Sequence, residues 1–117
     1  VLTLRGLFAP RGATWIASAR PLLEAAVRLA RQFAEPPALP LLVEGYADEP
    51  MAREALARLS LERAEAVAAE LRRAGVPAER LRTAGLGPDA PVAPSERPEG
   101  RALNNRIEIV FVSAVGR

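Results

Sequence analysis

The 117-residue sequence contains neither cysteine nor histidine. Without cysteine the chain can form no disulfide, no thiolate metal site and no iron–sulfur cluster, and it has no thiol nucleophile. Without histidine it has no Ser-His-Asp triad, no imidazole base at neutral pH and no His-ligated zinc. These absences remove many common catalytic and metal-binding chemistries, so we expect no cofactor and no metal.

The sequence also has no lysine and few aromatic residues. All 16 basic residues are arginine, and 14 acidic residues oppose them, so the net charge is only +2. Nucleic-acid binding needs clustered positive charge and aromatic surface for base stacking. Arg72 and Arg73 form a small basic cluster with Arg80 and Arg82, but a pair of cations suits the solvated end of a helix. We therefore expect no nucleic-acid partner.

Long hydrophobic runs are absent as well. The longest strong run, residues 109–112, falls far short of the roughly 18 residues of a membrane span. The chain begins in a strand-like stretch with no charged leader, so we expect a domain cut from a longer protein. Any contact with a membrane would then be made by parts outside these residues. Half of the residues are hydrophobic and 26% are charged, which is typical of one globular domain over residues 1–117.

Periodicity predicts an α+β fold. The expected strands, helices and one long loop are strand 2–8, helix 18–34, strand 41–45, helix 52–74, strand 81–86, loop 87–100 and strand 106–112. This βαβαβ order with a closing strand predicts one mixed sheet packed against two main helices. Right-handed crossovers bring the loops after the first two strands to the same edge of the sheet. The first helix is expected to bury a face made of Leu22, Ala26, Leu29, Ala30 and Phe33.

Two charged residues lie close to segments that are expected to be buried. Asp48 directly follows the strand 41–45, where a turn residue or helix cap is common. Arg63 lies on the border of the apolar arc of the helix 52–74. One interpretation is that its stem lies along the core while its head reaches water. The other is that its guanidinium points at a fixed carboxylate partner.

Four ordered blocks of the sequence resemble a known family. The family patterns [VI]-x-G-H-T-D, L-S-x-x-R-A-x-x-V, G-x-G and N-R-R-V-E-I correspond here to V-E-G-Y-A-D (43–48), L-S-L-E-R-A-E-A-V (59–67), G-V-P-A-E-R-L-R-T-A-G-L-G (75–87) and G-R-A-L-N-N-R-I-E-I (100–109). These blocks resemble the OmpA-like carboxy-terminal domain family over residues 43–112, and the first forty residues fit more loosely. The G-R-A-x-N block is most similar to versions in flagellar stator and type VI secretion proteins.

The resemblance implies a periplasmic domain that binds peptidoglycan non-covalently and anchors an envelope or outer-membrane protein to the cell wall. The family's ligand is meso-diaminopimelate of the stem peptide, and its binding Asp and Arg correspond to Asp48 and Arg63. The distal end of diaminopimelate carries an ammonium and a carboxylate on one carbon. A guanidinium can bind that carboxylate while an aspartate accepts from the ammonium. Without ligand, Asp48 and Arg63 are expected to pair with each other.

The other residues that the resemblance places in the peptidoglycan-binding site are Tyr46, Ala47, Glu49, Asn104 and Arg106. Backbone N–H groups of residues 47–49 are candidate donors. Several positions depart from the family pattern: Tyr46 and Ala47 replace His and Thr, Leu56 replaces Asn, and Asn105 replaces the first Arg of N-R-R. Each lost side-chain hydrogen bond is worth about 1 kcal/mol, so these departures weaken the expected affinity.

Two other functions remain open at this stage. The domain could be an assembly or dimerisation module that has lost its ligand, with Asp48–Arg63 as a structural ion pair and a second copy as partner. An enzyme is the other alternative, but only Glu44, Asp48 and Glu49 supply carboxylates near the site. Such close neighbours do not straddle a glycosidic bond at the roughly 5–9.5 Å that hydrolases need. We therefore expect a binding domain and not an enzyme.

Overall fold

The computed structural model describes residues 1–33 and 40–111. Its strands, α-helices and 3-10 turns are, in chain order, β1 (Leu2–Leu4), η1 (Ala17–Ala19), α1 (Arg20–Phe33), β2 (Leu41–Tyr46), α2 (Arg53–Arg73), η2 (Ala78–Arg80), β3 (Leu81–Gly85), α3 (Pro98–Asn104) and β4 (Arg106–Phe111). The predicted ends of the first helix at Ala34 and of the last strand at Val112 lie outside the described residues.

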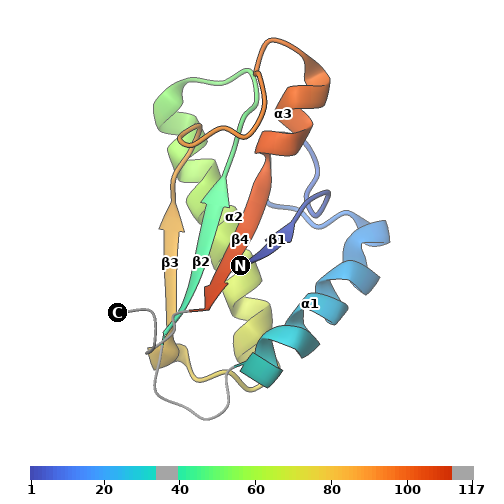
Figure 1. Ribbon diagram of the computed structural model, residues 1–117, viewed down its shortest axis with the longest axis vertical. Coiled ribbons are helices and arrows are strands. Elements are labelled where there is room, and N and C mark those ends of the chain that lie inside the picture. Colours follow the sequence, from blue (N-terminus) through green and yellow to red (C-terminus); the bar gives the residue numbers. More distant parts are fainter. Residues whose placement is uncertain (34–39, 112–117) are drawn as a thin grey trace.

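The four strands form one mixed sheet in the order β1-β4-β2-β3. The last strand, β4, lies antiparallel between β1 and β2, whereas β2 and β3 are parallel. Because β1, β2 and β3 all run in the same direction, their carboxyl ends share one edge of the sheet (Figure 1). The predicted α+β class, with one mixed sheet and two main helices, is confirmed.

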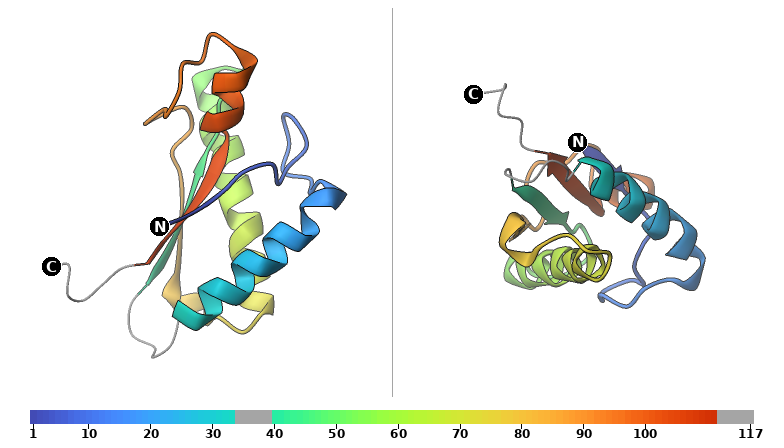
Figure 2. Two further views of the ribbon diagram at one scale, coloured as in Figure 1. Left: turned by 45° about the vertical axis from the view of Figure 1, so that its right-hand side comes forward. Right: turned by 90° about the horizontal axis from the view of Figure 1, so that it is seen from below.

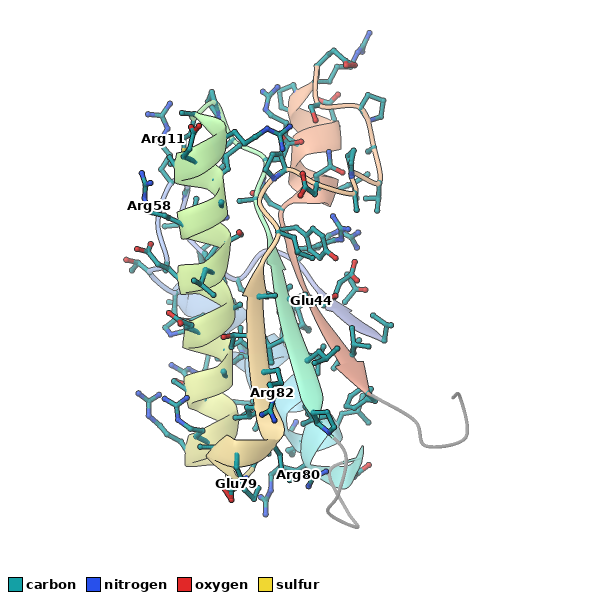
Figure 3. The ribbon with its side chains drawn as sticks, turned by 90° about the vertical axis from the view of Figure 1, so that its left-hand side faces the viewer. Arg11, Glu44, Arg58, Glu79, Arg80 and Arg82 are labelled. Atoms are coloured by element: carbon teal, nitrogen blue, oxygen red, sulfur yellow. The ribbon has the colours of Figure 1, made fainter. Side chains whose placement is uncertain are left out.

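The two long helices build the core against one face of this sheet. Helix α2 packs on β2 and β3, and α1 packs on β1 and α2 (Figure 2). Between them lie buried aliphatic side chains from each layer: Leu4, Ala26, Ala30, Val43, Val67, Leu71, Ile107 and Ile109. Glu44 projects from the opposite face of the sheet, away from α2 (Figure 3). No described helix has the length and apolar character of a membrane span.

Helix α2 approaches the sheet unusually closely at two glycines. Gly45 and Gly85 are register partners on β2 and β3. A Cβ atom on Gly45 would lie 2.0 Å from the carbonyl oxygen of Ser60, and one on Gly85 would lie 2.6 Å from the backbone nitrogen of Leu61. The absence of both side chains lets the α2 backbone rest directly on the strands. This contact fixes the position of the middle of α2 relative to the end of β2.

Two predicted boundaries were wrong. The first strand ends at Leu4 rather than residue 8, and Gly6, at φ +72°, turns the chain shortly afterwards. The predicted loop 87–100 contains the start of a short helix, α3, in which Pro98 occupies the first turn. Proline suits that position because the first N–H groups of a helix need no intrahelical partner.

The buried face of α1 also differs from the prediction. Leu22 and Leu29 are 44% and 38% exposed, whereas Leu23, Ala26 and Ala30 are buried. Two overlapping apolar stripes run along the helix, and both contain Ala26 and Ala30. One stripe also contains Leu22 and Leu29, and the other contains Leu23. Packing against β1 and α2 selects the stripe that contains Leu23, a choice that the sequence period alone does not make.

Replacing Gly45 with alanine should destabilise the domain. The new methyl group overlaps the Ser60 backbone, which cannot move without shifting α2, so we expect a loss of about 1–3 kcal/mol in the free energy of unfolding. Urea denaturation measures this. Gly12→Ala is the matched control, because a Cβ there meets only atoms 3.9 Å or more away. Equal stability of the two variants would contradict the close approach.

Candidate functional site

The candidate site lies at the edge of the sheet where β2 ends. The segment that joins β2 to α2, residues 47–52, meets the first loop of the chain and the junction of α3 with β4 there (Figure 1). The backbone of Ala47 donates to the carbonyl oxygen of Gly87 at 2.9 Å. This bond continues the pairing of β2 with the β3 side and fixes where residue 48 leaves the sheet.

Asp48 is buried, with 8% of its surface exposed, and is held by groups far away in the sequence. Its Oδ2 accepts from Ser95 Oγ at 2.6 Å and from Asn104 Nδ2 at 2.7 Å. Among the described residues, no donor contacts its Oδ1, and this oxygen is not enclosed by protein. Asp48 therefore has a fixed orientation with one carboxylate oxygen available.

Asn104 connects Asp48 to the loop that precedes α3. Its side-chain oxygen accepts from the backbone nitrogens of Val92 and Ala93, at 2.7 and 3.0 Å. Its Nδ2 also donates to the carbonyl oxygen of Ala93 at 2.9 Å. One buried amide thus holds this loop in shape and orients the Asp48 carboxylate, which places the predicted residue Asn104 beside Asp48.

Arg63 extends from the middle of α2 into the same edge and is only 5% exposed. Its Nε donates to the carbonyl oxygen of Gly12 at 2.8 Å, and its Nη2 donates to that of Ala9 at 3.2 Å. The guanidinium carbon lies 5.4 Å from the centre of the Phe8 ring. Arg63 therefore ties the first loop of the chain to α2. Of the two interpretations of its border position, the fixed guanidinium is the one observed.

The carboxylate paired with Arg63 belongs to Glu49. Arg63 Nη2 lies 2.7 Å from Glu49 Oε2, with side-chain exposures of 6% and 12%. The expected pairing of Arg63 with Asp48 in the free domain is therefore wrong. The Asp48 carboxylate is turned towards the hydroxyl of Ser95 and the amide of Asn104, and the adjacent glutamate takes the guanidinium instead.

Asn105 is a site residue that the sequence analysis treated only as a departure from the family. Its Oδ1 accepts from the backbone nitrogen of Asp48 at 2.9 Å and from Arg63 Nη1 at 3.2 Å. Its Nδ2 donates to the carbonyl oxygens of Asp48 and Arg101, each at 2.8 Å. One amide thereby bridges the acidic and the basic member of the site. In the sequence, the feature that could have identified Asn105 as a site residue is its position immediately before β4, opposite the end of β2.

Tyr46 and Arg106 form a stacked pair next to this bridge. They are register partners on β2 and β4, and the Arg106 guanidinium carbon lies 3.9 Å from the centre of the Tyr46 ring. Arg106 also donates to Glu108 Oε2 at 2.7 Å and to the carbonyl oxygen of Asn104 at 3.1 Å. Burial raises the pKa of the Tyr46 phenol, and the carboxylates of Glu44 and Glu108 raise it further, so the phenol stays neutral.

Two of the departures from the family pattern are neighbours in space. Ala47 and Leu56, which replace a Thr and an Asn, are both buried and pack with Leu59 and the partly buried Met51. Because both positions carry apolar side chains, they form an apolar cluster and leave no unpaired buried polar group there. These positions offer no side-chain hydrogen bonds, which leaves recognition to other groups.

A groove of about 810 Å³ opens beside the site. Its floor is formed by apolar side chains of β1, the first loop and the α3–β4 segment: Leu4, Leu7, Phe8, Leu103 and Ile107. Its charged lining has more cations than anions: Arg5, Arg11, Arg63, Arg101, Arg106, Glu49 and Glu99. Tyr46 and Asn105 also line it, whereas Asp48, Ala47 and Asn104 are not among its lining residues. The excess of arginine favours a ligand that carries carboxylates.

No group of three or more potential metal ligands gathers within residues 1–33 and 40–111. The predicted site residues are otherwise brought to one edge of the sheet. Asp48 and Arg63 are joined through Asn105, Glu49 is paired with Arg63, and Tyr46 is stacked on Arg106. Asn105 thus links the backbone of Asp48 to the guanidinium of Arg63 at this edge.

Replacing Arg63 with methionine should cost about 3 kcal/mol of stability, because the Glu49 carboxylate and the carbonyl oxygens of Gly12 and Ala9 lose a buried charged donor. The free energy of unfolding from urea denaturation tests this. Arg58→Met, on the exposed side of the same helix (Figure 3), should change stability by no more than about 0.5 kcal/mol. Similar losses for both variants would contradict the role of Arg63.

Known proteins resemble this chain in both sequence and structure. The probable lipoprotein YiaD of Escherichia coli is 45% identical over 69 residues, which cover 59% of this chain and 32% of the lipoprotein. The peptidoglycan-binding protein ArfA of Mycobacterium tuberculosis is 41% identical over 68 residues, which cover 58% of this chain and 21% of ArfA. The matched part thus represents about a third or less of the length of these relatives.

Among solved structures, the cell wall anchor of the T6SS from Pseudomonas aeruginosa superposes with a TM-score of 0.78 at 32% identity, over 95% of this chain and 80% of that one. The C-terminal domain of Helicobacter pylori MotB has the same fold, with a TM-score of 0.83 at 22% identity, over 99% of this chain and 88% of that one. The OmpA family model matches residues 7–105. The chain therefore belongs to the OmpA family.

Proposed function

We propose that this domain binds peptidoglycan non-covalently in the periplasm and anchors a larger envelope protein to the cell wall. Its family membership supports a binding domain rather than an enzyme. ArfA is described as a peptidoglycan-binding protein, and the 32% identical domain from Pseudomonas aeruginosa is described as a cell wall anchor. The similarity to MotB and T6SS domains also agrees with the sequence resemblance to flagellar stator and type VI secretion proteins.

The ligand that we propose is the diaminopimelate of the stem peptide. The observation that carries this proposal is the bridge in which the Asn105 amide joins Asp48 to Arg63 at the side of the groove. Asp48 Oδ1 has no donor among the described residues, and Arg63 Nη1 carries a second hydrogen beyond the one given to Asn105. An ammonium and a carboxylate on one carbon complement these two groups.

The neighbouring residues then have supporting roles. Asn104 orients the Asp48 carboxylate, and Arg106 holds Tyr46 at the wall of the groove. Ala47 contributes through its backbone, which fixes the end of β2. Glu49 is paired with the guanidinium of Arg63. The arginine-rich groove would hold the part of the stem peptide that continues from diaminopimelate.

Calorimetric titration with two stem peptides tests the proposal. One peptide carries diaminopimelate at its third position and the other carries lysine, which lacks the distal carboxylate. The diaminopimelate peptide should bind at least about tenfold more tightly, because only its carboxylate can reach Arg63. Equal affinities would remove the proposed role of Arg63.

Asp48→Asn should weaken binding of the diaminopimelate peptide by at least about tenfold, because the amide keeps the size of the side chain but loses its charge. The matched control is Asp89→Asn, which changes a carboxylate that is 64% exposed and paired with Arg53. The control should keep the affinity of the unchanged domain. An unchanged affinity in Asp48→Asn would contradict the proposal.

The assembly module without ligand remains the alternative, and size-exclusion chromatography separates it from the proposal. A domain that binds neither stem peptide and elutes as a dimer, with or without peptide, would support assembly through a second copy of the chain. The binding proposal expects the diaminopimelate peptide to bind whatever the oligomeric state.

A further inference from the structure

The guanidinium that the proposed ligand needs is already engaged by a carboxylate of the same chain. Glu49 Oε2 lies 2.7 Å from Arg63 Nη2, and both side chains are largely buried at the groove. A ligand carboxylate is chemically equivalent to the Glu49 carboxylate. The two groups would therefore compete for one cation.

The backbone holds Glu49 in this position. Pro50 restricts the backbone of Glu49 to extended conformations, which narrows the directions that its side chain can take. The second oxygen, Oε1, accepts from the backbone nitrogen of Arg11 at 2.5 Å. Arg11 has a left-handed backbone at φ 61°, an uncommon conformation for a residue other than glycine. Its position at the end of α2 nearest the site is visible in Figure 3.

The N–H groups of Arg63 leave little room for a second carboxylate. The Nε hydrogen goes to Gly12, and the Nη2 hydrogens go to Ala9 and Glu49. Nη1 gives one hydrogen to Asn105 and has one left for which no described residue is an acceptor. A ligand carboxylate can thus form a single hydrogen bond while Glu49 stays. A bidentate contact requires Glu49 to leave Nη2.

We propose that Glu49 is an internal competitor that a ligand carboxylate must displace from Arg63, and that it thereby sets the specificity of the site. This inference rests on the proposed function. The bonds of Arg63 to Gly12 and Ala9 do not involve Glu49, so the first loop stays attached when Glu49 moves into the groove. The displacement therefore exchanges one anion for another on Arg63 and exposes the backbone N–H of Arg11 to water, while the first loop keeps its two bonds to Arg63.

Competition from Glu49 determines which class of ligand can bind to Arg63. An attached carboxylate acts at a high effective concentration, in the millimolar range or above. A simple carboxylate loses translational and rotational entropy when it binds and makes no additional contact that compensates for this loss. It should therefore not replace Glu49. A ligand that also places an ammonium on Asp48 Oδ1 makes a second contact that Glu49 cannot make. Glu49 thus makes the ammonium a requirement and selects zwitterionic ends over plain acids.

Glu49→Gln removes the competing charge with almost no change in size and tests the inference. Calorimetry with the diaminopimelate stem peptide should show about tenfold tighter binding than in the unchanged domain. The matched control is Glu79→Gln, an exposed glutamate at the opposite end of the sheet that does not line the groove and gives the same change in net charge (Figure 3). Its affinity should change by less than about threefold, because its charge is not on Arg63. A gain below threefold in Glu49→Gln, or a gain matched by Glu79→Gln, overturns the inference.

A second measurement covers the case in which Glu49→Gln is poorly folded. Glu49→Asp keeps the charge but shortens the side chain by one methylene, so it weakens the pair without removing it. Its affinity should fall between those of the unchanged domain and Glu49→Gln. In both variants the diaminopimelate peptide should raise the melting temperature by more than it does in the unchanged domain. A smaller rise in both would show that Glu49 supports binding, which contradicts competition.

The two proposals fail in distinguishable ways. If neither the unchanged domain nor Glu49→Gln prefers the diaminopimelate peptide over the lysine peptide, the proposed function is wrong. If the unchanged domain has that preference and Glu49→Gln binds no more tightly, only the competitor is wrong. Binding that is seen in Glu49→Gln alone would support both proposals, with the competitor dominant in the unchanged chain.

Discussion

The functional edge of this domain depends on one buried cation. A guanidinium that is almost fully removed from water is stable only if its charge and its N–H groups are matched. Arg63 meets this requirement with two carbonyl oxygens of the first loop, the amide of Asn105 and the carboxylate of Glu49. The same contacts hold together three segments that are distant in the sequence. The contacts of the Arg63 guanidinium therefore hold in place the loops that form the groove.

The buried carboxylate of Asp48 also needs hydrogen-bond partners, and its partners are neutral groups. Asp48 is oriented by a hydroxyl and an amide, and the amide of Asn104 also fixes the loop before α3. Within the described residues, Asp48 forms no ion pair, whereas the Glu49 carboxylate is paired with Arg63. Two adjacent carboxylates therefore have different chemistry. Under the proposed function, Asp48 would receive the ammonium of the ligand and Glu49 would compete with its carboxylate.

Much of this protein could be predicted from the sequence. The positions of β2, α2, β3 and β4 follow from apolar periodicity and from the glycines and prolines between them. Family motifs predicted Asp48 and Arg63 as the principal site residues, and the structure brings them to the same edge of the sheet. Those motifs work because they record which residue types must occur at fixed distances along the chain. The absence of Cys and His narrowed the possible chemistry before any motif was considered.

The sequence by itself determined the elements, the family and the residues at the edge of the sheet, because these depend on local pattern and composition. Only the tertiary structure decided that Arg63 pairs with Glu49, that Asn105 bridges the site and that α1 buries Leu23 in place of Leu22. Each of these choices is between near neighbours in sequence that are almost equivalent in type. Packing across distant segments separates them, since a shift of one residue changes the direction in which a side chain points.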